Sequence, residues 1–182
     1  MLLADAIAML ADSEVSALGR TRWADLGCGD GTFTLALATL LGAGSTIHAM
    51  DRDGSALRTI PSAHNDVGIN THRGDFTTQP WPFGDLDGIL MANSLHYVAD
   101  QAAFIRACEA RMTMKRRFLI VEYDTDDASR WVPNPLSQAR LTAVFASAGY
   151  SSVRILHSRP SIYRRASLYS AMIGSRQCLD SA

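Results

Sequence analysis

Residues 23–32 read WADLGCGDGT and join a short run typical of a β-strand to a stretch with helical spacing. The three glycines, Gly27, Gly29 and Gly31, let the backbone turn sharply and let a ligand approach the main chain without meeting a Cβ. The free N–H groups at the start of the following helix point to the same place. The stretch therefore predicts an open α/β domain with a ligand held over its first strand-to-helix turn.

The rest of the chain alternates β-type runs with helical stretches, as expected of a parallel sheet with right-handed crossovers. The predicted strands have continuous apolar centres, which is typical of strands buried on both faces; they are Thr21–Leu26, Thr46–Asp51, Gly68–Arg73, Leu86–Ala92 and Arg117–Glu122. The predicted helices are Thr32–Leu41, with a left-handed cap at Gly42, Gln101–Met112, with Asp100 as N-cap, and Leu136–Ala148.

The last third of the chain changes character. Tyr150–His157 and Ala166–Ile173 read as two strands with no helix between them, and Arg159-Pro160-Ser161 reads as a turn. Two strands joined without a crossover must be antiparallel, so the sheet is expected to end in a hairpin. We interpret residues 1–182 as one domain, with an N-terminal helical segment over 1–19 and a core over 20–182.

Composition excludes several classes of protein. The chain has 182 residues, a net charge of −1, 47% hydrophobic and 19% charged residues, which fits a globular domain and disfavours a general nucleic-acid binder. No basic signal start and no membrane-length apolar run are present, so we expect a cytoplasmic protein with no membrane partner. The three cysteines, Cys28, Cys108 and Cys178, form no disulfide framework.

Acidic residues follow the predicted strands. Asp25 precedes the glycine loop, where a fixed anion disfavours a pyrophosphate and suits an ammonium group. Asp51 closes the second strand and can accept hydrogen bonds from both hydroxyls of a ribose. Asp75 can accept from the exocyclic amine of adenine, while Phe76 offers the purine an apolar surface. The carboxyl ends of parallel strands meet at one edge, so these side chains predict a single nucleoside-binding crevice.

The segments 24–32 (ADLGCGDGT), 48–53 (HAMDRD), 73–76 (RGDF) and 87–98 (DGILMANSLHYV) resemble the class I S-adenosylmethionine-dependent methyltransferases. The resemblance implies a Rossmann-like seven-stranded sheet with helices on both faces, in the order 3-2-1-4-5-7-6 with strand 7 antiparallel. It implies S-adenosylmethionine as cofactor, with Asp51 at the ribose and Asp75 and Phe76 at the adenine. By the same resemblance the remaining cofactor contacts are Asp25, Gly27, Cys28, Gly29, Arg52 and Asn93.

In this family the loops after strands four and five face the reactive methyl group. The sequence NSLH at 93–96 lacks the Asn/Asp-Pro-Pro-aromatic motif of many base and glutamine N-methyltransferases, and so resembles the small-molecule branch. His96 is the first candidate for a general base, and Tyr123 and Asp124 are second candidates, although a histidine that only makes structural hydrogen bonds remains an equal alternative. His96, Tyr97, Tyr123 and Trp131 are the expected substrate contacts.

Two clusters of charged residues are not expected to bind a ligand. The acidic turn at Asp124, Asp126 and Asp127 is expected to be solvated, so no metal site is predicted. The arginines of the terminal hairpin, which could meet an anionic substrate, are expected instead to decorate a solvated surface; they are Arg154, Arg159, Arg164 and Arg165.

The sequence thus predicts a methyltransferase that moves a methyl group to a small-molecule acceptor by in-line displacement. Two alternatives stay open: an NAD(P)-dependent oxidoreductase, which Thr32 in place of a third fingerprint glycine disfavours, and a non-catalytic methyltransferase-like binding subunit. The expected partner is the small molecule, with a homodimer as an open alternative.

Overall fold

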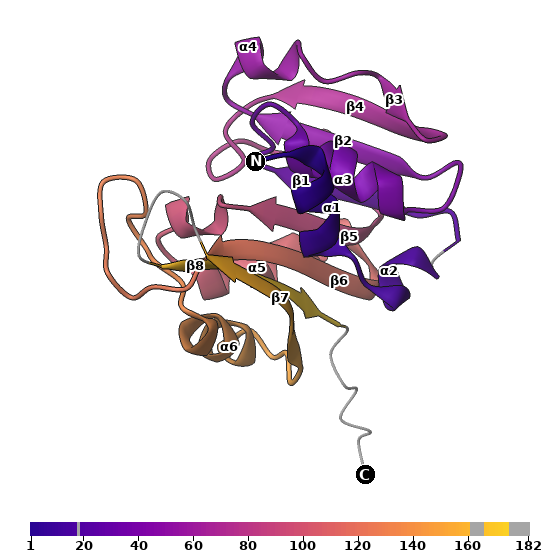
Figure 1. Ribbon diagram of the computed structural model, residues 1–182. Coiled ribbons are helices and arrows are strands. Elements are labelled where there is room, and N and C mark those ends of the chain that lie inside the picture. Colours follow the sequence, from indigo (N-terminus) through magenta and orange to yellow (C-terminus); the bar gives the residue numbers. More distant parts are fainter. Residues whose placement is uncertain (18, 161–165, 175–182) are drawn as a thin grey trace.

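The strands predicted from continuous apolar runs form the middle of one mixed sheet (Figure 1). The structure is a computed structural model and describes residues 1–17, 19–160 and 166–174. Within these residues the strands are β1 (Arg22–Leu26), β2 (Thr46–Asp51), β3 (Ala63–His64), β4 (Val67–Arg73), β5 (Leu86–Ala92), β6 (Met112–Tyr123), β7 (Val153–Pro160) and β8 (Ser167–Ile173). They lie in the order β3-β4-β2-β1-β5-β6-β8-β7.

The strand count corrects the prediction, because the described residues form eight strands and not seven. The additional strand, β3, pairs antiparallel with β4 at the sheet edge, so the full order also differs from 3-2-1-4-5-7-6. Asn65 and Asp66 join the two strands with φ of 47° and 61°, the left-handed pair of a two-residue hairpin turn. Without β3, the succession of the other seven strands corresponds to the one that the resemblance implies.

The sheet is parallel in its middle and contains an antiparallel strand near the C-terminal end of the chain. Strands β4, β2, β1, β5 and β6 are parallel, and β8 is antiparallel to both β6 and β7. The carboxyl ends of the parallel strands therefore meet at one edge, as the crevice prediction requires.

The turn predicted at residues 159–161 does not begin at residue 159, because Arg159 and Pro160 belong to β7, while Ser161 lies outside the described residues.

Helices cover both faces of this sheet (Figure 1). On one face α1 (Leu3–Leu10) and α3 (Thr32–Leu40) contribute to one hydrophobic cluster, and on the other α5 (Gln101–Cys108) and α6 (Gln138–Ser147) contribute to a second. The shorter helices are α2 (Ser13–Ser16), α4 (Gly54–Leu57), and the 3-10 turns η1 (Leu95–Tyr97) and η2 (Glu109–Arg111). No helix of the described residues is long and apolar enough to cross a bilayer.

The helix ends follow local hydrogen bonding. Asp100 is the N-cap of α5, as predicted, and its side chain accepts from the backbone N–H of Ala103. The predicted left-handed cap at Gly42 is wrong: α3 ends at an extended Leu41, and Gly44 is the residue with positive φ. Helix α5 is shorter than predicted because η2 tightens its last turn before β6 begins at Met112.

The N-terminal segment is fastened to the edge strand β7. Arg154 lies 2.6 Å from the carboxylate of Asp12 and 3.1 Å from that of Glu14, and Arg159 lies 3.0 Å from Asp5. These two arginines of the hairpin are therefore paired within the chain and do not form a free anion-binding surface. Arg164, Arg165 and Cys178 lie outside the described residues.

Gly88, in the middle of the sheet, leaves no room for a larger side chain. Gly88 on β5 is paired in register with Trp23 on β1, and a Cβ at Gly88 would collide with the ring carbons of that fully buried indole. We expect Gly88→Ala to lower the free energy of unfolding by about 2 kcal/mol or more, because a close-packed core cannot absorb the added methyl group. Urea denaturation measures this loss. Gly84→Ala, whose Cβ would meet only Arg111 O at 3.8 Å, is the control and should cost far less.

Candidate active site

The glycine loop is tied to the end of the second strand. The backbone N–H groups of Gly27 and Cys28 donate to the carbonyl of Met50 at 2.8 and 3.1 Å, and that of Gly29 donates to the carboxylate of Asp51 at 2.9 Å. Gly27 and Gly29 have φ of 79° and 55°, a conformation that glycine adopts without strain. The loop therefore holds its bent shape through β2 as well as through its own residues.

Asp51 joins three segments at the carboxyl edge of the sheet. One carboxylate oxygen accepts from Gly29 and the other from the backbone N–H of Asp53 at 2.8 Å, while the Asp51 carbonyl accepts from Gly74 at 2.9 Å. The carboxylate is thus fixed in orientation by backbone groups on both of its oxygens. A ligand hydroxyl can share these oxygens, because each retains a further lone pair.

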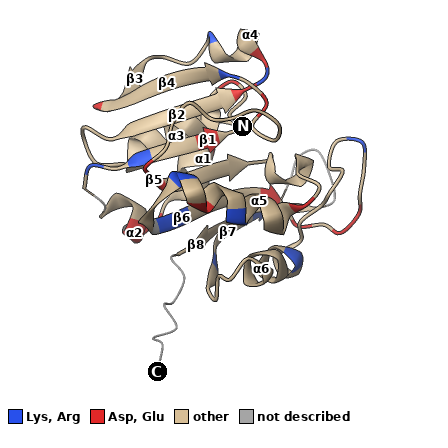
Figure 2. Cartoon of the chain, turned by 180° about the vertical axis from the view of Figure 1, so that it is seen from behind, with Lys and Arg blue, Asp and Glu red and all other residues tan. Residues whose placement is uncertain are grey.

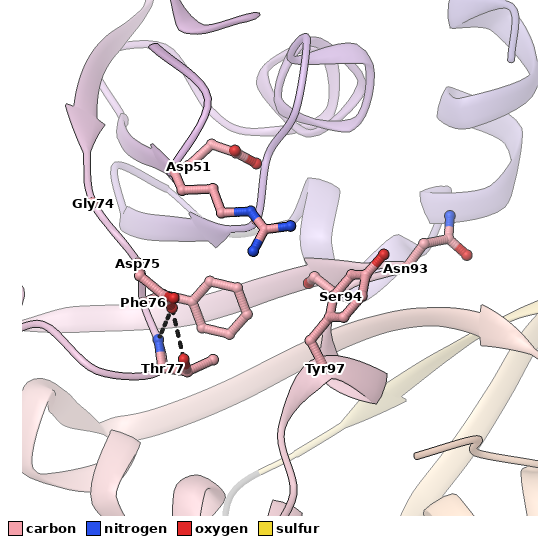
Figure 3. A pocket seen from close by; sticks show the side chains of 10 residues that line it. Asp51, Gly74, Asp75, Phe76, Thr77, Asn93, Ser94 and Tyr97 are labelled. Carbon is pink, nitrogen blue, oxygen red and sulfur yellow. Dashed lines mark hydrogen bonds between the residues drawn. The ribbon is translucent and has the colours of Figure 1, made fainter. Parts of the chain in front are cut away.

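A pocket of about 210 Å³ opens beside Asp51 (Figure 3). Its walls come from the ends of four different strands, and the lining residues are Gly27, Asp51, Arg52, Gly74, Asp75, Phe76, Thr77, Asn93, Ser94 and Tyr97. The structure therefore brings together six of the predicted cofactor residues. Gly29 adjoins the pocket through its hydrogen bond to Asp51, whereas Asp25 and Cys28 are not in the lining.

The Asp75–Phe76 wall is held by its own short turn. The Asp75 carboxylate accepts from the backbone N–H and the hydroxyl of Thr77 at 2.9 and 2.6 Å, and these bonds keep the pKa of Asp75 below its usual value (Figure 3). The Trp81 indole N–H donates to the Phe76 carbonyl at 3.1 Å, and the Phe76 ring meets Phe104 edge-on. The aromatic surface offered to the pocket is accordingly rigid.

Asp25 lies beneath the glycine loop and is completely buried. One of its oxygens accepts from the Thr34 hydroxyl at 2.6 Å, and the other has no partner among the described residues. The pKa of Asp25 is raised to about 7, chiefly by burial, against the lowering effect of the Thr34 hydrogen bond and with a smaller raising effect from the charge of Asp51. The sequence predicted this carboxylate beside the ligand, but the side chain is enclosed by the core.

Comparison with known proteins gives one family match. A family model described as a methyltransferase domain matches residues 24–115, which is half of the chain. The chain belongs to the class I S-adenosylmethionine-dependent methyltransferases. No curated protein matches the sequence. As an enzyme of this family the protein uses S-adenosylmethionine, and the oxidoreductase alternative is not retained.

Several solved structures share the fold at low identity. The N-terminal domain of EvdMO1 with SAH bound is 19% identical, with a TM-score of 0.65 over 96% of this methyltransferase and 81% of that chain. YcgJ from Bacillus subtilis is 13% identical, with a TM-score of 0.67 over 96% and 98%. The mitomycin 7-O-methyltransferase MmcR is 16% identical, with a TM-score of 0.63 over 96% and 54%. The methyltransferase spans only 38% of the full EvdMO1 chain.

Two observations indicate that the pocket of the methyltransferase fits S-adenosylmethionine. The space over Gly27 is confined: a Cβ there would lie 2.6 Å from the Cβ of Ser94 and 3.2 Å from the ring of Phe76. A Cβ at Gly29 would meet nothing within 4 Å, so the loop is open on that side. In addition, the buried Oδ1 of Asn93, a residue of the pocket lining, lacks a partner in the described part of the chain. An unpaired acceptor at the pocket wall suits a ligand that carries an N–H donor.

Of the four residues predicted to contact the acceptor, only Tyr97 lines the pocket. Tyr97 is 48% exposed and lines the pocket. His96 is buried behind it, with Nδ1 2.7 Å from a Glu122 carboxylate oxygen, and does not line the pocket. Tyr123 is half-buried against the core, and Trp131 is 67% exposed on the following loop with its ring 5.6 Å from the Arg130 guanidinium. Neither of these last two borders the pocket.

Sequence reasoning missed several residues of this site. Gly74, Thr77 and Ser94 line the pocket, and only their neighbours Asp75, Phe76 and Asn93 were predicted. The adjacency of Gly74 and Thr77 to Asp75 is the signal that could have found them. Nothing in the sequence indicates Glu122, which appears as one polar residue in a buried strand.

The first carboxylate of the acidic turn after β6 is bound to helix α6. Asp124 accepts from the backbone N–H and the side-chain amide of Gln138 at 3.0 and 2.9 Å, so its carboxylate fastens the start of α6. Among residues 1–17, 19–160 and 166–174 there is no group of three or more side chains suited to hold a metal ion.

Proposed function

We propose that this methyltransferase transfers the methyl group of S-adenosylmethionine to a small-molecule acceptor. The observation that carries the proposal is the convergence of Asp51, Asp75 and Phe76 on one pocket beside the bent glycine loop. In this proposal Asp51 accepts from the ribose hydroxyls, while Asp75 and Phe76 receive the adenine. The backbone of Gly27 and Gly29 borders the methionine part.

The remaining cofactor assignments follow from position. Arg52 and Asn93 line the pocket and are proposed as direct contacts. Asp25 and Cys28 are proposed to act from below the loop, since both are buried. Burial raises the pKa of the Cys28 thiol, which disfavours the reactive thiolate. Cys28 therefore contributes shape and not nucleophilic chemistry.

A small acceptor is supported by the charge of the molecule. Tyr97, which lines the pocket and is 48% exposed, is the aromatic residue proposed for the acceptor side. Basic and acidic segments are interspersed over the elements seen from behind (Figure 2), and the net charge is −1, so no strong basic field is offered to a nucleic acid. The fold is shared with a mitomycin 7-O-methyltransferase, whose named acceptor is a small molecule.

When bound, S-adenosylmethionine supplies a methyl group on a positively charged sulfur. The chain itself must hold the acceptor in line with that group and exclude competing water, because positioning provides much of the rate in such a displacement. Tyr97, which lines the pocket, is proposed as an acceptor contact, and Tyr123 and Trp131 are proposed as outer contacts. A homodimer and a cytoplasmic location stay predictions of the sequence.

Titration calorimetry and an acceptor screen test the proposal. We expect S-adenosylmethionine and S-adenosylhomocysteine to bind, and NAD⁺ not to bind. Formation of S-adenosylhomocysteine is then measured with panels of phenols, amines and thiols, and with protein and RNA as comparison acceptors. Turnover confined to the small molecules supports the proposal, whereas turnover only with protein or RNA overturns it.

A further inference from the structure

A buried acid–histidine pair lies directly behind the pocket wall. Glu122, near the end of β6, is fully buried, and His96 in η1 is 2% exposed. One Glu122 oxygen lies 2.7 Å from His96 Nδ1, and the other accepts from the backbone N–H of the same residue at 3.2 Å. Both carboxylate oxygens of Glu122 are therefore committed to one residue.

The carbonyl group of His96 is held from the opposite side. It accepts from both the backbone N–H and the side-chain amide of Asn134, each at 3.1 Å. The Asn134 carbonyl in turn accepts from the Gln101 side chain at 3.0 Å. The turn at residue 96 is thus clamped between β6, α5 and the segment that leads to α6.

This turn carries the pocket wall. Asn93, Ser94 and Tyr97 all line the pocket, and the Ser94 hydroxyl donates to the carbonyl of Leu26 at 2.6 Å, immediately before the glycine loop. The Ser94 side chain is also the group that a Cβ at Gly27 would strike first. A displacement of residue 96 would consequently move the surface against which the glycine loop rests.

Stability alone does not account for such a pair. A buried charge costs several kcal/mol to desolvate, and apolar residues of similar volume often replace a buried ion pair without loss. What a bidentate carboxylate adds is direction, since it fixes both the ring and the backbone of its partner.

We propose that Glu122 and His96 form a positioning unit that holds the 93–97 turn in its cofactor-binding shape, with His96 acting through Nδ1–H and not as a base. Glu122 fixes the tautomer with the proton on Nδ1. The other ring nitrogen, Nε2, is buried, has no partner among the described residues, and does not reach the pocket lining. This inference rests on the proposed function only in taking the pocket as the cofactor site.

Isosteric variants separate the two nitrogens. His96→Asn keeps an N–H donor near the place of Nδ1 and lacks Nε2, whereas His96→Gln places its amide near Nε2 and lacks the Nδ1 donor. We expect His96→Asn to bind S-adenosylhomocysteine within about threefold of the native affinity, and His96→Gln and Glu122→Ala to bind it at least tenfold more weakly. Titration calorimetry measures each dissociation constant, and thermal unfolding monitors the fold.

Two further variants keep the proposal falsifiable if the buried variants are unstable. Asn134→Ala, at a half-buried position, removes the side-chain amide that donates to the His96 carbonyl and keeps the backbone N–H that does the same, and we expect about fivefold weaker binding. Tyr169→Phe is the matched control, because it removes a buried hydrogen bond, to the Leu136 carbonyl at 3.0 Å, next to Glu122 in register but not attached to the turn. It should lower the melting temperature and leave the affinity unchanged.

The outcomes are distinct. Native affinity in Asn134→Ala, or a loss in Tyr169→Phe equal to that in Glu122→Ala, overturns the positioning role. An acceptor-dependent rate that collapses in His96→Asn while cofactor affinity persists would instead show that Nε2 is a base. If the native protein binds no sulfur ligand, the proposed function itself fails, which is a different result from any of these.

Discussion

Replacement of Asp51 by alanine is expected to weaken the binding of S-adenosylhomocysteine by about 100-fold, or about 2.7 kcal/mol. The variant loses two kinds of interaction at once. In the native chain the carboxylate accepts from Gly29 and Asp53, so its removal leaves two backbone N–H groups of the site without their partners. It also removes the charged acceptor that we propose for the ribose hydroxyls, and hydrogen bonds to charged groups contribute about 1.5–3 kcal/mol each.

Two matched variants divide this loss. Asp51→Asn retains a carbonyl oxygen that can accept from Gly29, so it should preserve the loop and lose only about tenfold in affinity. Asp53→Ala removes the neighbouring exposed carboxylate, which caps α4 through Ser55 and Ala56, and should leave the affinity unchanged. Titration calorimetry with each variant provides the measurement. An affinity in Asp51→Ala within threefold of native would show that Asp51 does not contact the cofactor.

The position of the Asp51 site could be predicted from the sequence because it depends on topology alone. In a parallel sheet the residues that follow β2 and β4 meet at one edge, so Asp51, Asp75 and Phe76 need only be correctly placed in their strands. The bounds predicted for β2 and β5 agree with the structure. The buried centre of β5 is continuous from Gly88 to Met91, whereas the half-buried His48 interrupts that of β2.

Side-chain direction could not be predicted in the same way. The residue type of His96 and its place after β5 make it a candidate base, but its orientation depends on Glu122, 26 residues further on. The strand that carries Glu122 reveals nothing about its partner. Similarly, β6 begins at Met112, five residues before the predicted start. The prediction missed these five residues because residues 112–116 mix apolar and polar types and lack the apolar run of the strand centre.

Asp25 shows the same limit within the best-predicted segment. Its place one residue before the end of β1 suggested a carboxylate at the strand tip beside the ligand. Residues 23–26 are buried on both sides, however, so the side chain is covered by α3 and meets Thr34. Burial on both faces, which made β1 easy to recognise, is the reason that its acidic residue does not line the pocket.

This burial makes the stability of the protein depend on the protonation of Asp25. A solvent-exposed aspartate has a pKa of 3.8, whereas Asp25 in the folded chain has a pKa of about 7. Between these values the folded state holds a proton that the unfolded state has lost, so the contribution of Asp25 to stability falls as the pH rises from about 4 to about 7. Above pH 7 the penalty is complete, and below pH 4 it is absent. Its full size is on the order of 2–4 kcal/mol.

Asp25→Asn should remove this dependence. An asparagine carbonyl can still accept from the Thr34 hydroxyl, while the neutral amide does not titrate. The unpaired amide N–H groups cost about 1–3 kcal/mol, so the test is the change with pH and not the absolute stability. We expect the free energy of unfolding of Asp25→Asn, relative to the native protein, to increase by about 2–4 kcal/mol between pH 4 and pH 8. Urea denaturation at a series of pH values measures it.

The exposed carboxylate of Asp30, in the same loop, provides the control. It accepts from the backbone N–H and the hydroxyl of Thr32, so Asp30→Asn changes the same net charge at the surface and should show no comparable increase. A pH-independent difference between Asp25→Asn and the native protein would mean that Asp25 is already ionised in the fold. In that case a cation must approach its unpaired oxygen, and the cofactor site would have to be reconsidered with Asp25 as a permanent anion beneath the glycine loop.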